Sequence, residues 1–460
     1  MSLPLARIVR LQCRALLDTR TARASLMVFL LAGLLGLWYG HVVIARQHVA
    51  LAASPALEAE QHAAVFRHVA PTARAADQLY YLHFHTRHEP GRWAPFALGL
   101  RDVQPYNLKI RLLALHGQLY AGELVNPLLV AAGHFDAAFV LAWLSPLLVI
   151  ALLHSLWAED RESGTWALVR AQSASPWRLL GLTCAVRVAV ALLPCLLLIG
   201  VAVAWWQLPL DGRIATVVAL TVAHVLFWSG MALLVVSRGY SSQVNALVLV
   251  GAWLLLALVG PGLITTVVSA RHPLPQALEL TVRQRQGYHA AWDRPLAQTM
   301  AAFYRHYPEF AGADVPTNTY SNAWYYAMQQ AGDDAAAPAA REYVAALERR
   351  RETSRRLARA FPPAVFQLAL NQVARTDLDS HLGYLQSVAT YHETLKREFL
   401  PAIFDGRPVS AVDWKALPRH GYRDVRAPEV TGALVTLWIA AFATLGAGAW
   451  ALARAVRREP

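Results

Sequence analysis

The chain has 460 residues, of which 56% are hydrophobic and only 16% are charged, and its formal net charge is +12 at pH 7. Soluble globular proteins carry roughly 25% charged residues, so this composition excludes an ordinary soluble protein and predicts an integral membrane protein. A basic balance can also indicate nucleic-acid binding, but here the arginines gather beside apolar stretches, as membrane topology requires, and we expect no nucleic-acid partner.

Six apolar stretches are long enough to cross a bilayer, which takes about 20 residues of helix. They lie at residues 25–45, 135–156, 182–206, 214–236, 244–268 and 430–452. In the basic start, residues 1–24, Ile8, Val9 and Leu16 lie near one helical face and arginines lie largely opposite. This pattern predicts a helix that lies along the cytoplasmic membrane surface. The predicted fold class is an all-α membrane protein with six transmembrane helices and a short tail, residues 453–460.

Arginines predict how these spans are oriented. They lie in four regions: before the first span, between the second and third spans, between the fourth and fifth spans, and after the sixth span. These arginines are Arg7, Arg10, Arg14, Arg20, Arg23, Arg161, Arg170, Arg178, Arg238, Arg454, Arg457 and Arg458. All four regions fall on one side of the membrane, and the side richer in arginine and lysine faces the cytoplasm. We therefore expect a multi-pass protein of the bacterial inner membrane with both termini in the cytoplasm.

Two long polar segments, residues 46–133 and 269–428, then lie outside, and together they exceed the length of many complete domains. We expect a mostly helical extracytoplasmic domain built from these two insertions. In the second segment, Leu378, Leu382, Leu385 and Val388 recur at helical spacing.

Local signals divide the second segment further. Thr376 followed by Asp379 resembles a capping box at the start of a helix. Pro362 and Pro363 predict the start of another helix, and the tract GDDAAAPAA at 332–340 predicts a loop or flexible link.

A histidine-rich stretch, HFHTRHE, lies in the first polar segment. On a helix, His85, His88 and Glu89 would share a face with the spacing of metal ligands. On a strand, His83 and His85 would share a face instead. A solvated or hydrogen-bonded histidine surface is the simpler interpretation, and we predict no metal site.

An aromatic cluster marks the second segment: Tyr320, Trp324, Tyr325 and Tyr326. These rings could line a substrate entrance or dock a partner. They could equally form the core of the outer domain or rest at the bilayer interface.

Polar residues inside the predicted spans are costly in lipid and must face the bundle interior, a partner or water. His224, near the middle of the fourth span, and Asn245, in the fifth, could line a pathway or make interhelical hydrogen bonds. Arg187, in the third span, could extend its side chain to the cytoplasmic interface.

Several enzymatic motifs are missing from the sequence. A nucleotide-binding P-loop needs a Gly-Lys pair, and none of the lysines, Lys109, Lys396 and Lys415, follows a glycine. The metalloprotease motif His-Glu-x-x-His and the hydrolase motif Gly-x-Ser-x-Gly are absent too. We predict that the chain is not an enzyme and binds no cofactor of its own.

The connector between the second and third spans, residues 157–180, is unusual: WAEDRESGTWALVRAQSASPWRLL. Acidic residues open it, Gly164 and Thr165 permit a sharp change of direction, and residues 166–172 can form a short helix that ends at Ser175-Pro176. A short helix of this kind can dock into a partner's groove and carry rigid-body motion to two spans. An ordinary charged loop is the alternative interpretation.

This connector resembles the signature of ABC-2-type transporter permeases, in which an acidic Glu-x-Gly-Thr motif and a Ser-Pro-x-Arg step flank the cytoplasmic coupling helix. The matching residues are Glu159, Glu162, Gly164, Thr165, Leu168, Ser175, Pro176, Arg178, Leu179 and Gly181. Leu182 stands where family members often have a lysine. Segments 241–264 and 361–385 are similar to a subset of this family with a large extracytoplasmic domain of uncharacterised function.

The resemblance implies a permease subunit that pairs with a second copy or a sister permease and with cytoplasmic ABC ATPases, which bind the ATP and Mg. The coupling residues would be Glu159, Glu162, Gly164, Thr165, Leu168, Pro176 and Arg178. ATP hydrolysis would then drive export or extraction of a substrate, and the outer domain could recruit a periplasmic partner. The alternative function is a non-transporting membrane sensor or assembly protein whose outer domain binds a ligand or partner.

Overall fold

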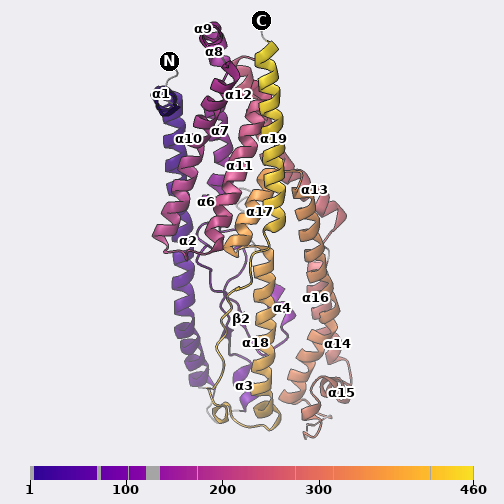
Figure 1. Ribbon diagram of the computed structural model, residues 1–460. Helices are drawn as coiled ribbons and strands as arrows, with labels where there is room; N and C mark the ends of the chain where they lie inside the picture. The colour runs from indigo at the N-terminus through magenta and orange to yellow at the C-terminus, as the bar shows by residue number, and fades with distance from the viewer. Residues whose placement is uncertain are drawn as a thin grey trace.

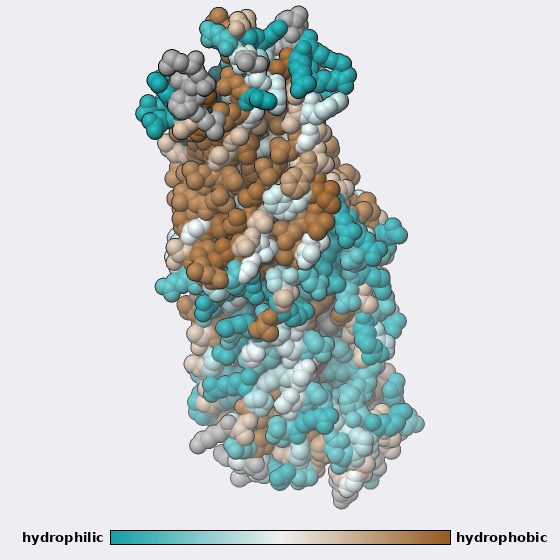
Figure 2. All heavy atoms as spheres, in the orientation of Figure 1, coloured by the Kyte–Doolittle hydropathy of each residue, from teal (hydrophilic) through white to brown (hydrophobic). Residues whose placement is uncertain are grey.

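The computed structural model describes residues 5–69, 74–101, 103–120, 135–173, 175–274, 276–313, 315–316, 318–414 and 416–458. Residues 121–134, the end of the first predicted outer segment, lie outside this description. Most of the described residues are helical, and the strands among them are one short antiparallel pair, β1 (Phe84–His85) and β2 (Lys109–Ile110). The molecule is elongated (Figure 1), with an apolar half and a polar half that Figure 2 separates by colour.

The apolar half is a bundle of helices, and six helices among the described residues are long and apolar enough to cross a membrane. They are α2 (Arg20–His68), Ala137–Glu162, α10 (Pro176–Trp205), α11 (Gly212–Val236), Ser242–Arg271 and α19 (Thr431–Arg458). Each covers one of the apolar stretches predicted from the sequence to within two residues. This agrees with the predicted all-α membrane protein.

Two of these helices are interrupted by π-helical turns. Ala137–Glu162 contains α6 (Ala137–Phe139), the π-helical η1 (Val140–Leu144), α7 (Ser145–Leu153) and α8 (Ala158–Glu162). Ser242–Arg271 contains α12 (Ser242–Leu254), the π-helical η2 (Leu255–Val259) and α13 (Gly260–Arg271). Such turns are rare in proteins and frequent at functional sites.

Helix α2 is much longer than the predicted span at residues 25–45. It has 49 residues, which corresponds to roughly 70 Å, and it runs from the bundle into the polar half (Figure 1). The sequence after residue 45 loses its apolar character but keeps good helix formers. Hydropathy therefore indicates where lipid contact ends, and not where this helix ends.

Glycines on α2 allow close packing against the rest of the chain. A Cβ atom on Gly36 would lie 2.9 Å from the backbone of Asp136, and one on Gly40 would lie 1.9 Å from the carbonyl oxygen of Pro95. Both distances are shorter than any ordinary contact. These two positions require glycine because backbone lies directly against the helix.

The polar half is a domain with its own core, called the polar domain below. Its elements are β1, β2, α3 (Ala75–Leu79), α4 (His116–Tyr120), α14 (Gln276–Trp292), α15 (Leu296–His306), α16 (Asn322–Ala358), α18 (Leu378–Phe404) and the 3₁₀ turns Pro308–Phe310 and Val409–Ala411. Both polar segments supply buried side chains to one core, for example Leu79 and Ile110 from the first and Phe303 and Phe399 from the second. Trp324 and Tyr326 of the aromatic cluster also lie in this core, whereas Tyr320 is exposed.

The prediction of a loop at residues 332–340 is wrong, because the tract lies inside α16. Alanine is the strongest helix former, and here the alanines also serve packing. Ala336, Ala339 and Ala340 are buried together, and Ala335 would lie 3.3 Å from a Cβ atom on Gly287 of α14. The small residues therefore let α14 and α16 approach closely.

The predicted capping box at Thr376 is also wrong, by one residue. Asp377 caps α18, and its carboxylate accepts a hydrogen bond from the backbone N–H of Ser380 at 3.4 Å. The carboxylate of Asp379 instead accepts from Arg355 of α16 at 2.9 Å. The predicted start of a helix at Pro362 is confirmed.

Helix α17 (Pro362–Ala374) belongs to the second polar segment but packs inside the apolar bundle. It contacts α11, α19 and both π-helical turns, and Figure 1 places it beside α11 and α19. The ring of Phe366 stacks on His224 of α11, with centroids 4.4 Å apart and planes 8° apart. His224 Nε2 in turn donates to the carbonyl of Ala142 in η1 at 3.2 Å. The polar domain is thus anchored within the bundle.

Phe366→Ala is expected to destabilise this anchor by about 3–5 kcal/mol, because it leaves a cavity opposite His224. Thermal unfolding of the purified protein in lipid nanodiscs measures the loss. The matched control is Leu368→Ala on the same helix, whose side chain is 39% exposed, and this change is expected to cost less than about 1 kcal/mol. Equal unfolding temperatures for the two variants would contradict the anchoring role.

Buried histidines make the stability of the polar domain depend on pH. Burial, reinforced by the charge of Arg101, lowers the pKa of His88 to about 3 and of His381 to about 4. Burial and the charge of Arg87 lower the pKa of His420 to about 4. In an unfolded chain a histidine has a pKa of about 6.5, so below this pH the unfolded state binds protons that the folded state does not.

Stability is therefore complete above pH 6.5 and is expected to fall as the pH falls towards 4. Below the unfolded pKa each histidine contributes about 1.4 kcal/mol per pH unit, so acidification from pH 7.5 to 5.5 costs about 4 kcal/mol through these three residues alone. Denaturant unfolding at the two pH values measures the difference, and His420→Gln should reduce it by about 1.4 kcal/mol. A stability that stays constant over this interval would contradict the assignment of neutral rings.

Candidate functional site

The connector between α7 and α10 lies at the end of the bundle that also carries α1 (Leu5–Asp18) and both ends of the chain (Figure 1). Its two short helices are α8 and α9 (Thr165–Gln172), and α9 lies at the tip of this end, near the height of the end of α19 (Figure 1). The polar domain lies at the opposite end of the molecule.

The path of the connector follows the local sequence signals. Gly164 has φ +73°, a left-handed conformation that glycine adopts without a steric penalty. The chain turns there and continues as α9, and Pro176 occupies the first turn of α10, where its missing N–H costs nothing. The predicted turn, short helix and Ser-Pro boundary are all present.

Two tryptophans hold the base of the connector. Trp157 and Trp166 are buried, and their rings meet edge to face with centroids 5.9 Å apart. The guanidinium of Arg161 lies 5.0 Å from the Trp157 ring centre and donates to the carbonyl of Gly239 at 2.6 Å. These contacts join the connector to the turn between α11 and α12.

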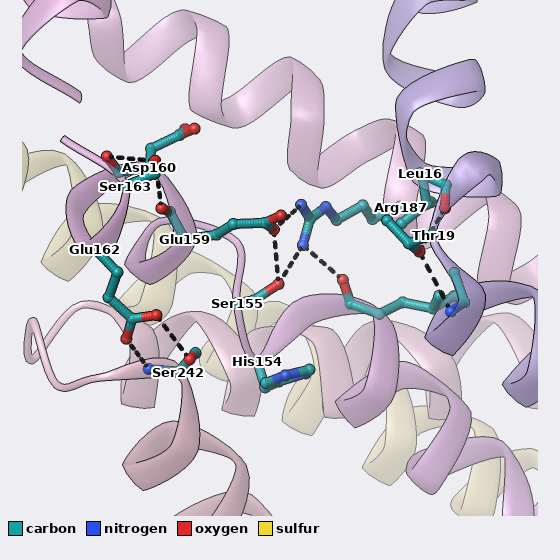
Figure 3. Close-up of polar contacts among 12 residues, drawn as sticks. Leu16, Thr19, His154, Ser155, Glu159, Asp160, Glu162, Ser163, Arg187 and Ser242 are labelled. Atoms are coloured by element: carbon teal, nitrogen blue, oxygen red, sulfur yellow. Dashed lines mark hydrogen bonds and ion pairs between the residues drawn. The ribbon is translucent and has the colours of Figure 1, made fainter. Parts of the chain in front are cut away.

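Glu162 binds the start of α12. Its carboxylate accepts hydrogen bonds from the backbone N–H of Ser242 at 2.6 Å and from the Ser242 hydroxyl at 2.9 Å (Figure 3). A helix N-terminus carries free N–H groups and a partial positive charge, so a carboxylate is stabilised there. The acidic residue therefore links α8 to the fifth predicted span.

Glu159 makes the corresponding link to α10. Its carboxylate lies 3.6 Å from the guanidinium of Arg187 and accepts from the hydroxyl of Ser155 at 3.2 Å (Figure 3). Arg187 also donates to the carbonyl of Leu152 at 2.9 Å and to Ser155 at 3.2 Å. Its side chain is mostly buried, and its guanidinium points to the end of α7 and the connector; that it reaches the membrane surface stays a prediction.

Thr165 stabilises the turn between α8 and α9. Its hydroxyl donates to the carbonyl and to the carboxylate of Asp160, both at 3.2 Å, and lies 2.9 Å from the hydroxyl of Ser163. Such short-range side-chain bonds to the backbone favour turns over continued helix. Thr165 therefore shapes the connector from within.

A cavity of about 510 Å³ opens beside these contacts, between α1, α7, α8, α9 and α10. Among the residues that line it are Gln12, Thr19, His154, Glu159, Asp160 and Arg187. The walls carry both apolar and charged groups. A cavity of this size and polarity can accept side chains from a docked segment.

The predicted coupling residues separate into two sets. Glu159, Glu162, Gly164, Thr165 and Pro176 are engaged in the contacts and turns that give the connector its shape. Leu168, in contrast, is 61% exposed on α9, and Arg178 is exposed beside Trp177, with its guanidinium 5.4 Å from the ring centre. Glu159, Glu162, Gly164 and Thr165 are exposed as well, so both sets reach the surface, but the second set presents side chains that do not shape the connector.

Sequence analysis missed the partners that hold the connector. The groups that donate to Glu159 and Glu162 belong to Arg187 and Ser242, which are distant along the chain. One available signal was an arginine inside a span next to an acidic connector, since such a charge needs a partner. Another was the pair Ser241-Ser242 directly before the fifth span, which is typical of a helix start.

The two polar residues predicted inside the spans both make interhelical hydrogen bonds. His224 bonds to Ala142, as described above. Asn245, which is fully buried, donates to the carbonyls of His154 at 3.1 Å and Tyr240 at 3.4 Å. A role in a transport pathway stays a prediction for both.

The metal-ligand spacing considered for His85, His88 and Glu89 needs a helix, and this part of the chain is not helical. His85 lies in β1, and Glu89 pairs with Arg423 at 2.6 Å. Within the described ranges, no group of three or more histidine, cysteine, aspartate or glutamate side chains is placed to hold a metal ion. His83 and His85 both line an open pocket with Lys109, as the strand alternative requires.

Comparison with known proteins identifies one family. A family model described as "Domain of unknown function (DUF3526)" matches residues 278–423. The match covers less than half of the chain and includes most of the second polar segment with α17. No curated protein and no solved structure matches the chain.

Gly164→Ala is expected to destabilise the connector locally by about 1–2 kcal/mol, because alanine pays the cost of the left-handed conformation. A Cβ atom there meets nothing within 4 Å, so the left-handed backbone conformation alone causes the expected loss of stability. Hydrogen exchange of the amides in α8 and α9 should accelerate at least fivefold. The matched control is Gly181→Ala, also free of contacts but inside α10, which should leave exchange in the connector unchanged. Equal exchange in both variants would contradict the constraint.

Proposed function

We propose that this chain is the permease subunit of an ABC-2-type ATP-driven exporter. In this role it couples ATP hydrolysis by a separate ATPase subunit to export or extraction of a substrate. The observation that carries the proposal is the connector: α9 lies at the tip of the bundle with Leu168 exposed, while the base of α8 and α9 is fixed to several helices. A coupling helix needs this combination of a free face and a rigid base.

Force applied to α9 would reach three predicted spans at once. The Glu162–Ser242 bonds lead to α12, the Glu159–Arg187 pair leads to α10, and α8 continues directly from the end of α7. Rigid-body movement of packed helices is a common form of conformational switching. The connector therefore acts as a lever on these helices rather than as a flexible loop.

In this proposal the connector, α1 and both termini face the cytoplasm, and the polar domain lies outside. Arginines near these elements support that orientation by the positive-inside rule. The sequence lacks a P-loop, so the partner ATPase must supply the ATP and Mg site. Two permease chains, identical or sister subunits, would complete the assembly.

Leu168→Asp should weaken binding of the ATPase at least tenfold, because it places a charge at the centre of the exposed α9 face. The probes are the ABC ATPases encoded in the same genome, each co-expressed with the full-length permease and measured by co-purification. The matched control is Leu210→Asp, in the turn between α10 and α11 at the other end of these helices, where the leucine is 89% exposed. This control should retain the ATPase.

Two outcomes would contradict the proposal. An ATPase that binds the Leu168→Asp variant as tightly as the native chain would remove α9 from the interface. An ATPase that binds but hydrolyses ATP at the same rate with and without the permease would favour the alternative, a sensor or assembly protein that does not transport.

A further inference from the structure

A small cavity lies in the polar domain where α17 ends and α18 begins, far from the connector. Its lining includes His88, Arg101, Arg375, Asp377, Ser380 and His381. The volume is about 10 Å³, which is room for one water molecule or one monatomic ion. Four parts of the chain meet here: the loop after β1, the loop around residue 101, the end of α17 and the start of α18.

Among the residues that the structure describes, no carboxylate contacts Arg101, which is a buried cation. Its side chain is 4% exposed. Nε donates to the amide oxygen of Gln47 at 3.0 Å and Nη2 donates to the carbonyl of His88 at 2.6 Å, so both acceptors are neutral. Nη1 has no acceptor, and none of the ion pairs among the described residues includes Arg101. Its charge is therefore not balanced by contact with a carboxylate.

Arg375 adds further unpaired donors to the same cavity. The residue is 7% exposed, and its Nε and Nη2 atoms lack acceptors. Nη1 lies 3.8 Å from the carboxylate of Asp424, but that carboxylate is bonded more closely by Arg426, at 2.7 and 2.9 Å. Two buried guanidinium groups thus share one cavity with donors left over.

The other groups around the cavity do not cancel this charge. His88 and His381 are neutral at pH 7, as their pKa values above indicate, whereas burial lowers the pKa of Arg101 only to about 10 and leaves it charged. Asp377, the carboxylate in the lining, accepts from the backbone of Ser380 and lies 3.8 Å from Arg355. A buried charge requires a partner of opposite sign.

We propose that this cavity binds a single halide ion, chloride in the cell, held by the guanidinium groups of Arg101 and Arg375. A water molecule would accept from one or two donors but would bring no charge. A phosphate or carboxylate group is too large for the volume. The ion would join α2, through Gln47 and Arg101, to the junction of α17 and α18, and would thereby stabilise the segment that anchors the polar domain in the bundle. This inference is independent of the proposed ATPase.

Thermal unfolding of the full-length protein in nanodiscs tests the site, with chloride exchanged for gluconate at constant ionic strength and pH 7.5. The native protein should unfold several degrees higher in chloride, the shift should saturate with chloride concentration, and bromide should replace chloride. Arg101→Gln should abolish the shift. Arg423→Gln, which changes an exposed arginine outside the cavity, should keep it.

A native protein that unfolds at the same temperature in chloride and gluconate would overturn the proposal, as would an Arg101→Gln variant that keeps the full shift. If Arg101→Gln does not fold, Arg375→Gln serves as the second variant with the same expectation. Crystals grown in bromide provide an independent measurement. An anomalous peak beside Arg101 Nη1 supports the halide, and ordinary water density there without anomalous signal excludes it.

Discussion

The stacking of Phe366 on His224 is the contact on which the arrangement of the two halves depends. It places a helix of the polar segment inside the apolar bundle, and the hydrogen bond from His224 to Ala142 fixes the ring against η1. A histidine surrounded by apolar side chains needs an acceptor to offset the loss of water. The carbonyl of Ala142 meets that need and so determines which face His224 presents to Phe366.

Both π-helical turns contact α17 where it lies in the apolar bundle. One of them, η2, belongs to the helix whose first residue is bound by the connector. Glu162 binds the first residue of α12, α12 leads through η2 into α13, and Gly260 at the start of α13 lies against Phe361, directly before α17. A Cβ atom on Gly260 would lie 2.3 Å from the Phe361 ring. A continuous series of contacts therefore runs from α8 to the polar domain, and it gives the proposed coupling a physical route between the two ends.

Signals confined to a few consecutive residues were predicted well. The six apolar stretches, the turn at Gly164, the helix after it and the proline-led start of α17 all follow from local composition and backbone chemistry. The helix across residues 332–340 was predicted wrongly, because Gly332 and Pro338 were taken as signs of a loop although both lie within α16. The partners of Glu159 and Glu162 and the insertion of α17 depend on contacts between residues far apart in sequence, for which a single sequence carries no local signal.

Arg187 and Arg101 are both largely buried, so both carry the free-energy cost of removing a positive charge from water, but their surroundings differ. Arg187 meets a carboxylate, a hydroxyl and a carbonyl, so its charge and its donors are matched within the protein. Among the described residues, Arg101 donates to an amide and a carbonyl, which satisfy donors but leave the positive charge unbalanced. Burial of an unbalanced charge is among the largest penalties that a fold can carry. The polar domain retains it beside a cavity of ionic size, and this pairing of an uncompensated charge with available space is what distinguishes a site for an ion from a defect in packing.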